Sequence, residues 1–135
     1  MQFVKTLRRR IPVVLAAMLV LGASRPTRVS THVVELQRNR FAPADLRTRK
    51  GDTVRFVNGL GGPHNVQFEA DSIAAAARAL IDAAMPDKIR PLMSPMLILF
   101  EESYTLVVPD LAPGRYPYFC SPHYGNMRGA LIVLR

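Results

Sequence analysis

The chain has 135 residues, enough for one ordinary domain and too few for two, so a single compact core has to carry any function. It contains 18 Lys and Arg, 10 Asp and Glu, and one Cys, which gives a formal net charge of +8. The basic residues are spread out and are not interleaved with aromatic side chains, so a nucleic-acid partner is not expected. Their densest group is interpreted as the solvated outer face of a strand: Arg47, Arg49, Lys50 and Arg55.

The N-terminal segment has the composition of a secretory signal peptide, predicted at 1–24. Residues 5–10 contain four basic side chains, 11–21 are apolar apart from Pro12, and 22–24 are small. The apolar run is shorter than the roughly 20 residues that a membrane-spanning helix needs, so cleavage is favoured over retention as an anchor.

The mature domain is therefore predicted at 25–135, in the periplasm or another extracytoplasmic compartment, with no membrane contact after cleavage. The leader holds four of the 18 basic residues and none of the acidic ones, so the mature charge is 14 − 10 = +4. A single Cys cannot form a disulfide within an exported chain. The thiol is expected either to be buried and inert or to be protected by a bound metal.

From Thr31 onward, short β-prone runs alternate with turn residues, which is the pattern of a sandwich or barrel. Residues 45–49 and 53–58 each alternate in polarity around the turn at Lys50-Gly51-Asp52, so we interpret them as a pair of strands. The remaining β-prone or extended apolar runs are 32–36, 64–68, 96–100, 103–108, 114–120 and 130–134.

One segment departs from the β pattern. Residues 71–85 are rich in Ala and place larger apolar side chains at helical spacing, with Asp71 or Ser72 as the predicted cap and Pro86 ending the helix. The sequence thus predicts an all-β domain with one surface helix.

A thiolate, an imidazole and a thioether fall within eight residues, at Cys120, His123 and Met127. Thiolate and thioether favour Cu(I), imidazole also suits Cu(II), and two His, one Cys and a weak axial Met form the usual electron-transfer copper site. His64 is the candidate second imidazole, because it follows a Gly-rich loop and opens a strand, whereas His32 matches no part of this pattern. Each of these residues alone could serve only in packing, but their joint occurrence favours a metal site.

Several motifs stand in the order seen in plastocyanins and their bacterial relatives, and the chain resembles that family over nearly the whole predicted domain. They are Phe41-Ala42-Pro43, Lys50-Gly51-Asp52-Thr53-Val54, Pro63-His64-Asn65-Val66, Met93-Ser94-Pro95 and Tyr118-Phe119-Cys120-Ser121-Pro122-His123. The resemblance implies a cupredoxin-like Greek-key β-sandwich of about seven to eight strands. It also implies one type 1 (blue) copper ion bound by His64, Cys120, His123 and Met127, and hydrogen bonds from Asn65 that link the two ligand loops. Three residues separate His123 from Met127, one fewer than in the usual plastocyanin loop.

The function implied by this resemblance is transfer of one electron at a time between redox partner proteins that dock transiently near His123, by a protein that is expected to be monomeric. The expected docking surface is small and apolar: Leu60, Gly61, Gly62, Pro63, Pro122 and Tyr124. The alternative is a copper carrier or storage protein without an electron-transfer role, for which Met85, Met93 and Met96 would form a second site. Their irregular spacing favours packing. No enzyme activity is expected, because the chain lacks the paired His-x-His motifs and the second domain of multicopper enzymes.

Overall fold

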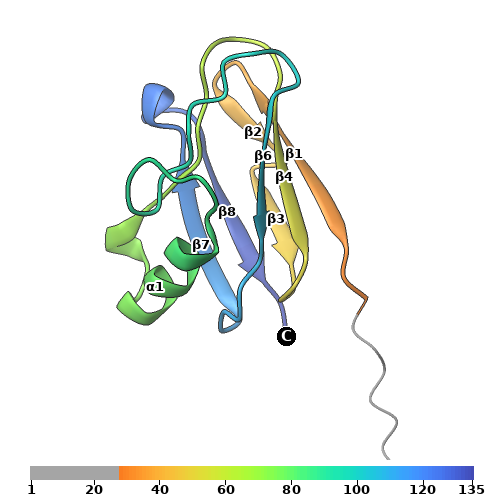
Figure 1. Cartoon of the computed structure of the whole chain (residues 1–135), viewed down its shortest axis with the longest axis vertical. Coiled ribbons are helices and arrows are strands. Elements are labelled where there is room, and N and C mark those ends of the chain that lie inside the picture. The colour runs from red at the N-terminus through yellow and green to blue at the C-terminus, as the bar shows by residue number, and fades with distance from the viewer. Residues whose placement is uncertain (1–27) are drawn as a thin grey trace, which may run out of the picture.

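The computed structural model describes residues 28–135, so the predicted leader lies outside the described residues. Two four-stranded sheets pack face to face around one apolar core, with strand orders β2-β1-β4-β6 and β3-β8-β7-β5 (Figure 1). The strands are β1 (Thr31–Gln37), β2 (Arg40–Ala42), β3 (Asp45–Thr48), β4 (Thr53–Asn58), β5 (Gln67–Phe68), β6 (Ser103–Val107), β7 (Gly114–Phe119) and β8 (Arg128–Val133). This arrangement confirms the predicted all-β sandwich.

The core is built from the alternating inward positions of both sheets. Tyr118 on β7 is the largest fully buried side chain, and three phenylalanine rings meet it edge to face. Phe41, Phe56 and Phe68 lie with ring centroids 4.8, 5.5 and 5.7 Å from that of Tyr118. Burying aromatic rings of this size removes a large apolar area from water and so helps to hold the two sheets together.

The predicted pair of strands around Lys50-Gly51-Asp52 exists, but the two strands are not partners. Strand β3 pairs in parallel with β8 in one sheet, whereas β4 pairs with β1 and β6 in the other. The turn therefore carries the chain across the sandwich. Both strands need their inward residues covered by the opposite sheet, and alternation of polarity alone does not show which sheet a strand joins.

The helix is shorter than predicted. It is α1 (Ala75–Ala84), preceded by the 3-10 turn η1 (Ala70–Ser72). Its N-cap residue is Ala74, which makes no side-chain capping bond, so the prediction of Asp71 or Ser72 as the cap is wrong. Only Ile81 is buried within the helix, which lies on the outside of the sandwich beside β7 (Figure 1). Within residues 28–135, no helix has the length and apolar character needed to cross a membrane.

Two predicted extended runs form less strand than expected. The run 64–68 yields only β5 (Gln67–Phe68), and 96–100 contributes one isolated bridge, from Leu97 to His64. Leu97 is buried, whereas the apolar residues after it are about two-thirds exposed: Ile98, Leu99 and Phe100. An apolar run was thus not sufficient evidence of a buried strand.

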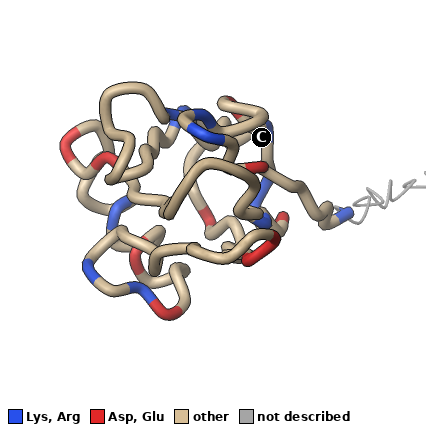
Figure 2. Tube along the Cα trace, turned by 90° about the horizontal axis from the view of Figure 1, so that it is seen from above, with Lys and Arg blue, Asp and Glu red and all other residues tan. Residues whose placement is uncertain are grey.

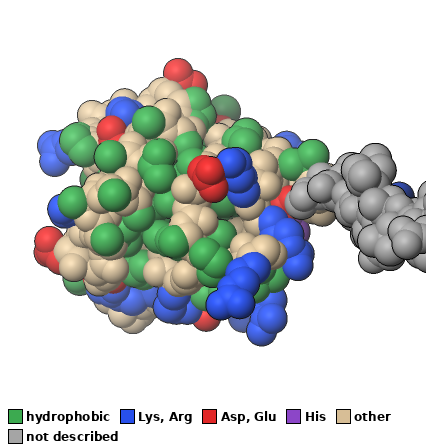
Figure 3. Space-filling view, turned by 90° about the horizontal axis from the view of Figure 1, so that it is seen from below, with side chains coloured by type: hydrophobic (Ala, Val, Ile, Leu, Met, Phe, Trp, Pro, Cys, Tyr) green, Lys and Arg blue, Asp and Glu red, His purple; other side chains and the backbone are tan. Residues whose placement is uncertain are grey.

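The segment that follows β7 and the segment that precedes β5 meet at one end of the sandwich, the upper end in Figure 1. Seen from this end, the basic and acidic positions are interspersed along the chain trace (Figure 2). At the opposite end, basic side chains gather along one margin beside apolar and acidic ones (Figure 3). The basic group predicted on an outer strand face is exposed: Arg47, Arg49, Lys50 and Arg55.

Candidate metal centre

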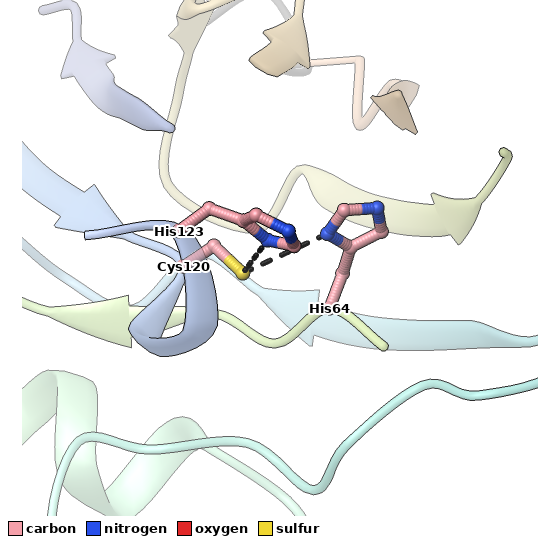
Figure 4. Close-up of side chains that lie close together, drawn as sticks. All are labelled: His64, Cys120 and His123. Atoms are coloured by element: carbon pink, nitrogen blue, oxygen red, sulfur yellow. Dashed lines mark hydrogen bonds between the residues drawn. The ribbon is translucent and has the colours of Figure 1, made fainter. Parts of the chain in front are cut away.

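Three predicted ligands converge at the upper end of the sandwich (Figure 4). One donor atom each from His64, Cys120 and His123 lies within 4.8 Å of the other two. The Cys120 Sγ atom is 3.5 Å from Nδ1 of His123 and 3.7 Å from Nδ1 of His64. Residues 56 positions apart in the sequence are therefore brought to a single point.

The backbone of His64 is held in place by hydrogen bonds to Leu97 and by the glycine turn that precedes it. Its N–H donates to the Leu97 carbonyl at 3.0 Å, and its carbonyl accepts from the Leu97 N–H at 2.7 Å. Before it, Gly61 and Gly62 have φ angles of +104° and +132°. A Cβ at Gly61 would lie 2.5 Å from the Arg38 Cα, so glycine is needed there both for the conformation and for the space.

The 3-10 turn η2 (Ser121–His123) places the other two donors. With three residues per turn, it stacks His123 above Cys120, and the His123 N–H donates to the Cys120 carbonyl at 3.1 Å. Two hydrogen bonds then bring Met127 back next to these residues. The Met127 N–H donates to the His123 carbonyl at 2.9 Å, and the Met127 carbonyl accepts from the Cys120 N–H at 3.0 Å. The Met127 side chain is fully buried, and these backbone bonds hold it next to the two loop residues.

Asn65 ties the two ligand segments together, as the resemblance implied. Its Oδ1 accepts from the Ser121 N–H at 2.8 Å, and its Nδ2 donates to Ser121 Oγ at 3.2 Å. The Ser121 hydroxyl in turn donates to Gln67 Oε1 at 2.7 Å. Gln67 was missed from the sequence, because its part depends on the pairing of Gln67 with Phe119 across two strands.

Burial shifts the pKa of His64 and of Cys120 toward their uncharged forms. Burial lowers the pKa of His64, and the neighbouring His123 lowers it further, so the imidazole keeps the lone pair that a metal needs. Burial raises the pKa of the Cys120 thiol, against the opposing effect of the backbone N–H groups of Asn65 and His123. Formation of the thiolate at neutral pH is therefore coupled to metal binding.

The spacing of the donors fits a first-row metal ion. Metal–nitrogen lengths of about 2.0–2.1 Å and a metal–sulfur length of about 2.3 Å, with angles of about 110–120°, place the sulfur and each nitrogen roughly 3.5–3.8 Å apart. The observed separations of 3.5 and 3.7 Å agree with this. One thiolate with two imidazoles is moreover the donor set of electron-transfer copper sites.

The sequence also singled out His32 and three further methionines. His32 contacts Asp52, with its Nε2 atom 2.9 Å from Oδ2, and takes no part in the site. Met85 is buried in the apolar core, in agreement with the packing interpretation, and Met93 and Met96 are partly buried.

Two face-to-face sheets with a His–Cys–His cluster at one end define a cupredoxin-like blue copper protein. The model of the family "Copper binding proteins, plastocyanin/azurin family" matches residues 28–134, and the chain belongs to this family. Membership makes it a copper-binding electron-transfer protein, and a carrier or storage role is not favoured.

Individual relatives agree with this assignment. The chain is 30% identical to "Plastocyanin" of Synechococcus sp. (strain JA-2-3B'a(2-13)) over 98% of each chain. It is 38% identical to "Plastocyanin, chloroplastic" of Chlamydomonas reinhardtii over 69% of this chain and 57% of that longer protein. Among solved structures, a variant of amicyanin superposes with a TM-score of 0.55 at 28% identity, covering 88% of this chain and 89% of the other.

Proposed function

We propose that the protein shuttles single electrons between redox partners through one type 1 copper ion held by His64, Cys120 and His123, with Met127 as the weak axial ligand. The observation that carries the proposal is the convergence of one sulfur and two imidazole nitrogens within 4.8 Å. When bound, copper supplies the one-electron couple, and the protein supplies a fixed set of donors.

The surrounding residues hold these donors in one geometry. His64 is fixed by Leu97, and the turn with Cys120 and His123 is fixed by Asn65. Because these supports are hydrogen bonds that join separate segments of the chain, the donors can keep nearly the same positions in both oxidation states. Little rearrangement then accompanies gain or loss of an electron, which favours fast transfer.

Met127 is proposed as the axial ligand on the basis of its surroundings. Its side chain is fully buried, and its N–H and carbonyl are hydrogen-bonded to His123 and Cys120. The thioether is therefore shielded from solvent, and Met127 comes after both Cys120 and His123 on the same loop. The short connection to His123 limits how far its sulfur can move, so the axial interaction is proposed as the main control of the reduction potential.

We propose that partners dock on the apolar surface around the partly exposed His123. All the residues expected there are exposed: Leu60, Gly61, Gly62, Pro63, Pro122 and Tyr124. The structure adds an apolar loop, 98–100, which follows the Leu97 contact with His64. Glu102 accepts hydrogen bonds from the N–H groups of Ile98 and Leu99 at 2.6 and 2.9 Å, so the loop presents its side chains outward in a defined shape. A small apolar surface suits a brief encounter.

We further propose that the protein is exported, with 1–24 as a cleaved leader and 25–135 as a monomeric cupredoxin domain. The start of the family match at residue 28 supports this boundary. We also propose that the domain is not an enzyme, because a single cluster of metal-binding side chains occurs within 28–135 and the proposed donors already account for it.

The ligand assignment is tested by loading the purified domain with Cu(II) and recording visible absorption and electron paramagnetic resonance spectra. We expect an intense thiolate-to-copper charge-transfer band that is lost in Cys120→Ser and strongly altered in His64→Ala. His32→Ala is the matched control and should keep the wild-type spectrum. A wild-type protein that binds Cu(II) tightly without this band would contradict the assignment.

The electron-transfer role and the docking surface can be tested without a known partner. Electron self-exchange between the Cu(I) and Cu(II) forms, followed by NMR line broadening, requires two copies to approach through their copper ends. We expect Leu60→Lys to slow self-exchange, whereas Val107→Lys, at an apolar residue on β6 that is also exposed, should not. Equal rates in both variants would contradict docking near Leu60, and rapid loss of copper to an acceptor without self-exchange would favour a carrier.

A further inference from the structure

Arg128, the first residue of β8, makes an unusual set of contacts directly after the last ligand of the loop. Its guanidinium carbon lies 4.4 Å from the ring centroid of Tyr124 and 5.9 Å from that of Phe119. Its Nη1 atom is 3.1 Å from Glu69 Oε1. The two rings meet edge to face, with centroids 4.8 Å apart and planes at 89°. We call these four side chains the aromatic clasp.

The sheet register explains how the clasp forms. Arg128 on β8 pairs with Phe119 on β7, which pairs with Gln67 on β5. Side chains directly opposite one another in a sheet share a face, and Glu69 follows Gln67 by two positions. The Arg128 side chain can therefore cross Phe119 and reach Glu69, spanning three strands on the outside of the sandwich. Cys120 follows Phe119 and is buried on the inside.

Tyr124 is the member of the clasp that belongs to the ligand loop. It lies between His123 and Met127, and the residues after it face solvent. A Cβ at Gly125 would meet no atom within 4 Å, so the tip of the loop is open to its surroundings. The contact of the Tyr124 ring with Arg128 and Phe119 thus ties the middle of this loop to the sheet.

We propose that Arg128 is a positioning residue for the copper site, which acts through Tyr124 to fix the loop between His123 and Met127. The inference rests on the proposed ligand assignment. A planar guanidinium can stack on a ring and bind a carboxylate at the same time, whereas a Lys ammonium acts only as a point charge. Arg128 therefore does more than balance the charge of Glu69, and its loss should loosen the segment that sets the distance from His123 to Met127.

The test compares Arg128→Ala, Arg128→Lys and Arg115→Ala. Arg115 is the matched control, since it is an exposed arginine in an ion pair on the same sheet, with its Nη1 2.6 Å from Asp45 Oδ2, and it has no place in the clasp. In the copper-free protein, Arg128→Ala should speed amide hydrogen exchange at Asn126 and Met127, whose N–H groups donate to the His123 carbonyl, by roughly five- to tenfold, the loss expected for an exposed cation–π contact with its ion pair. The exchange rate in Arg128→Lys should lie between those of the wild type and Arg128→Ala, and the rate in Arg115→Ala should match the wild type.

In the copper-loaded protein, Arg128→Ala should also shift the reduction potential. A threefold change in the relative affinity for the two oxidation states equals about 28 mV for a one-electron couple, and a shift of at least this size is expected. Unchanged exchange and potential in Arg128→Ala, or the same changes in Arg115→Ala, would overturn the inference. Because the exchange experiment uses copper-free protein, its outcome is separate from the ligand assignment, which fails only if the wild type shows no charge-transfer band.

Discussion

Replacing Asn65 with Ala should loosen the connection between the two ligand segments, because Asn65 follows His64 directly and is hydrogen-bonded to Ser121 in the turn η2. The side chain is fully buried and makes two bonds to Ser121, at 2.8 and 3.2 Å. Neither bond can be replaced by the methyl group of Ala. The Ser121 N–H would be left without its acceptor next to Cys120.

The magnitude follows from these contacts. Two lost hydrogen bonds cost about 0.5–1.5 kcal/mol each, and the unpaired N–H adds about 1–3 kcal/mol where water cannot reach it. Because Ser121 is only partly buried, the expected loss in the free energy of unfolding is about 2–4 kcal/mol. For a domain near 100 residues this corresponds to a fall in Tm of roughly 9–18 °C.

The assay is thermal and urea unfolding of the copper-free protein, together with the rate of copper loss to a chelator. Asn126→Ala is the matched control, since Asn126 lies in the same loop with its side chain exposed, and it should leave stability nearly unchanged. Ser121→Ala keeps the Ser121 N–H bond to Asn65 but loses the hydroxyl's bonds to Asn65 and Gln67, so it should also destabilise the protein, by about 1–3 kcal/mol. A loss below about 1 kcal/mol in Asn65→Ala, or a loss equal to that of Asn126→Ala, would refute the reasoning.

Three further predictions concern the axial ligand, the packing of β8 and the pH dependence of folding. Met127→Leu should keep copper bound and raise the reduction potential measured by voltammetry, because a donor to Cu(II) is lost; an unchanged potential would mean that Met127 is not a ligand. Gly129→Ala should destabilise the protein by about 1–3 kcal/mol in urea unfolding, since its Cβ would meet the Ala44 carbonyl and lie 2.7 Å from Tyr118 Cε2, whereas Gly125→Ala should be neutral. Burial would raise the pKa of Asp52, but hydrogen bonds from Ser30, His32 and Arg49 outweigh it and lower the pKa. This contribution is complete above the unfolded pKa of about 4 and is lost as the pH falls through the folded value. The difference in unfolding free energy between wild type and Asp52→Asn should therefore shrink below about pH 4, and a constant difference would contradict the assignment.

The sequence indicated the candidate ligands on the β7–β8 loop, because their placement is local. Cys120 and His123 are three residues apart, and a single turn brings such positions together, so their spacing indicates a shared site. The alternating polarity of β4 likewise fixed its inward residues, Val54 and Phe56, since a strand has a period of two. Even His64 could be predicted, through the glycines before it and the small number of histidines.

Tertiary structure decided what depends on contacts between distant segments. Strand β3 joined the opposite sheet from β4, because the partners available across the sandwich, and not polarity, select the sheet. The run 96–100 left the core after Leu97, since only that residue pairs with His64, and its remaining apolar side chains became surface.

Dependence on distant contacts also explains why the proposed ligands could be predicted from the sequence, whereas the residues that position them could not. Gln67 and Arg128 have no distinctive local pattern, and each acts only because strand register brings it opposite Phe119. Long-range register is set by the packing of the whole core, so it cannot be read from any short stretch of sequence. The sequence by itself therefore determined which atoms could bind copper, and only the folded sandwich decided which side chains hold those atoms in place.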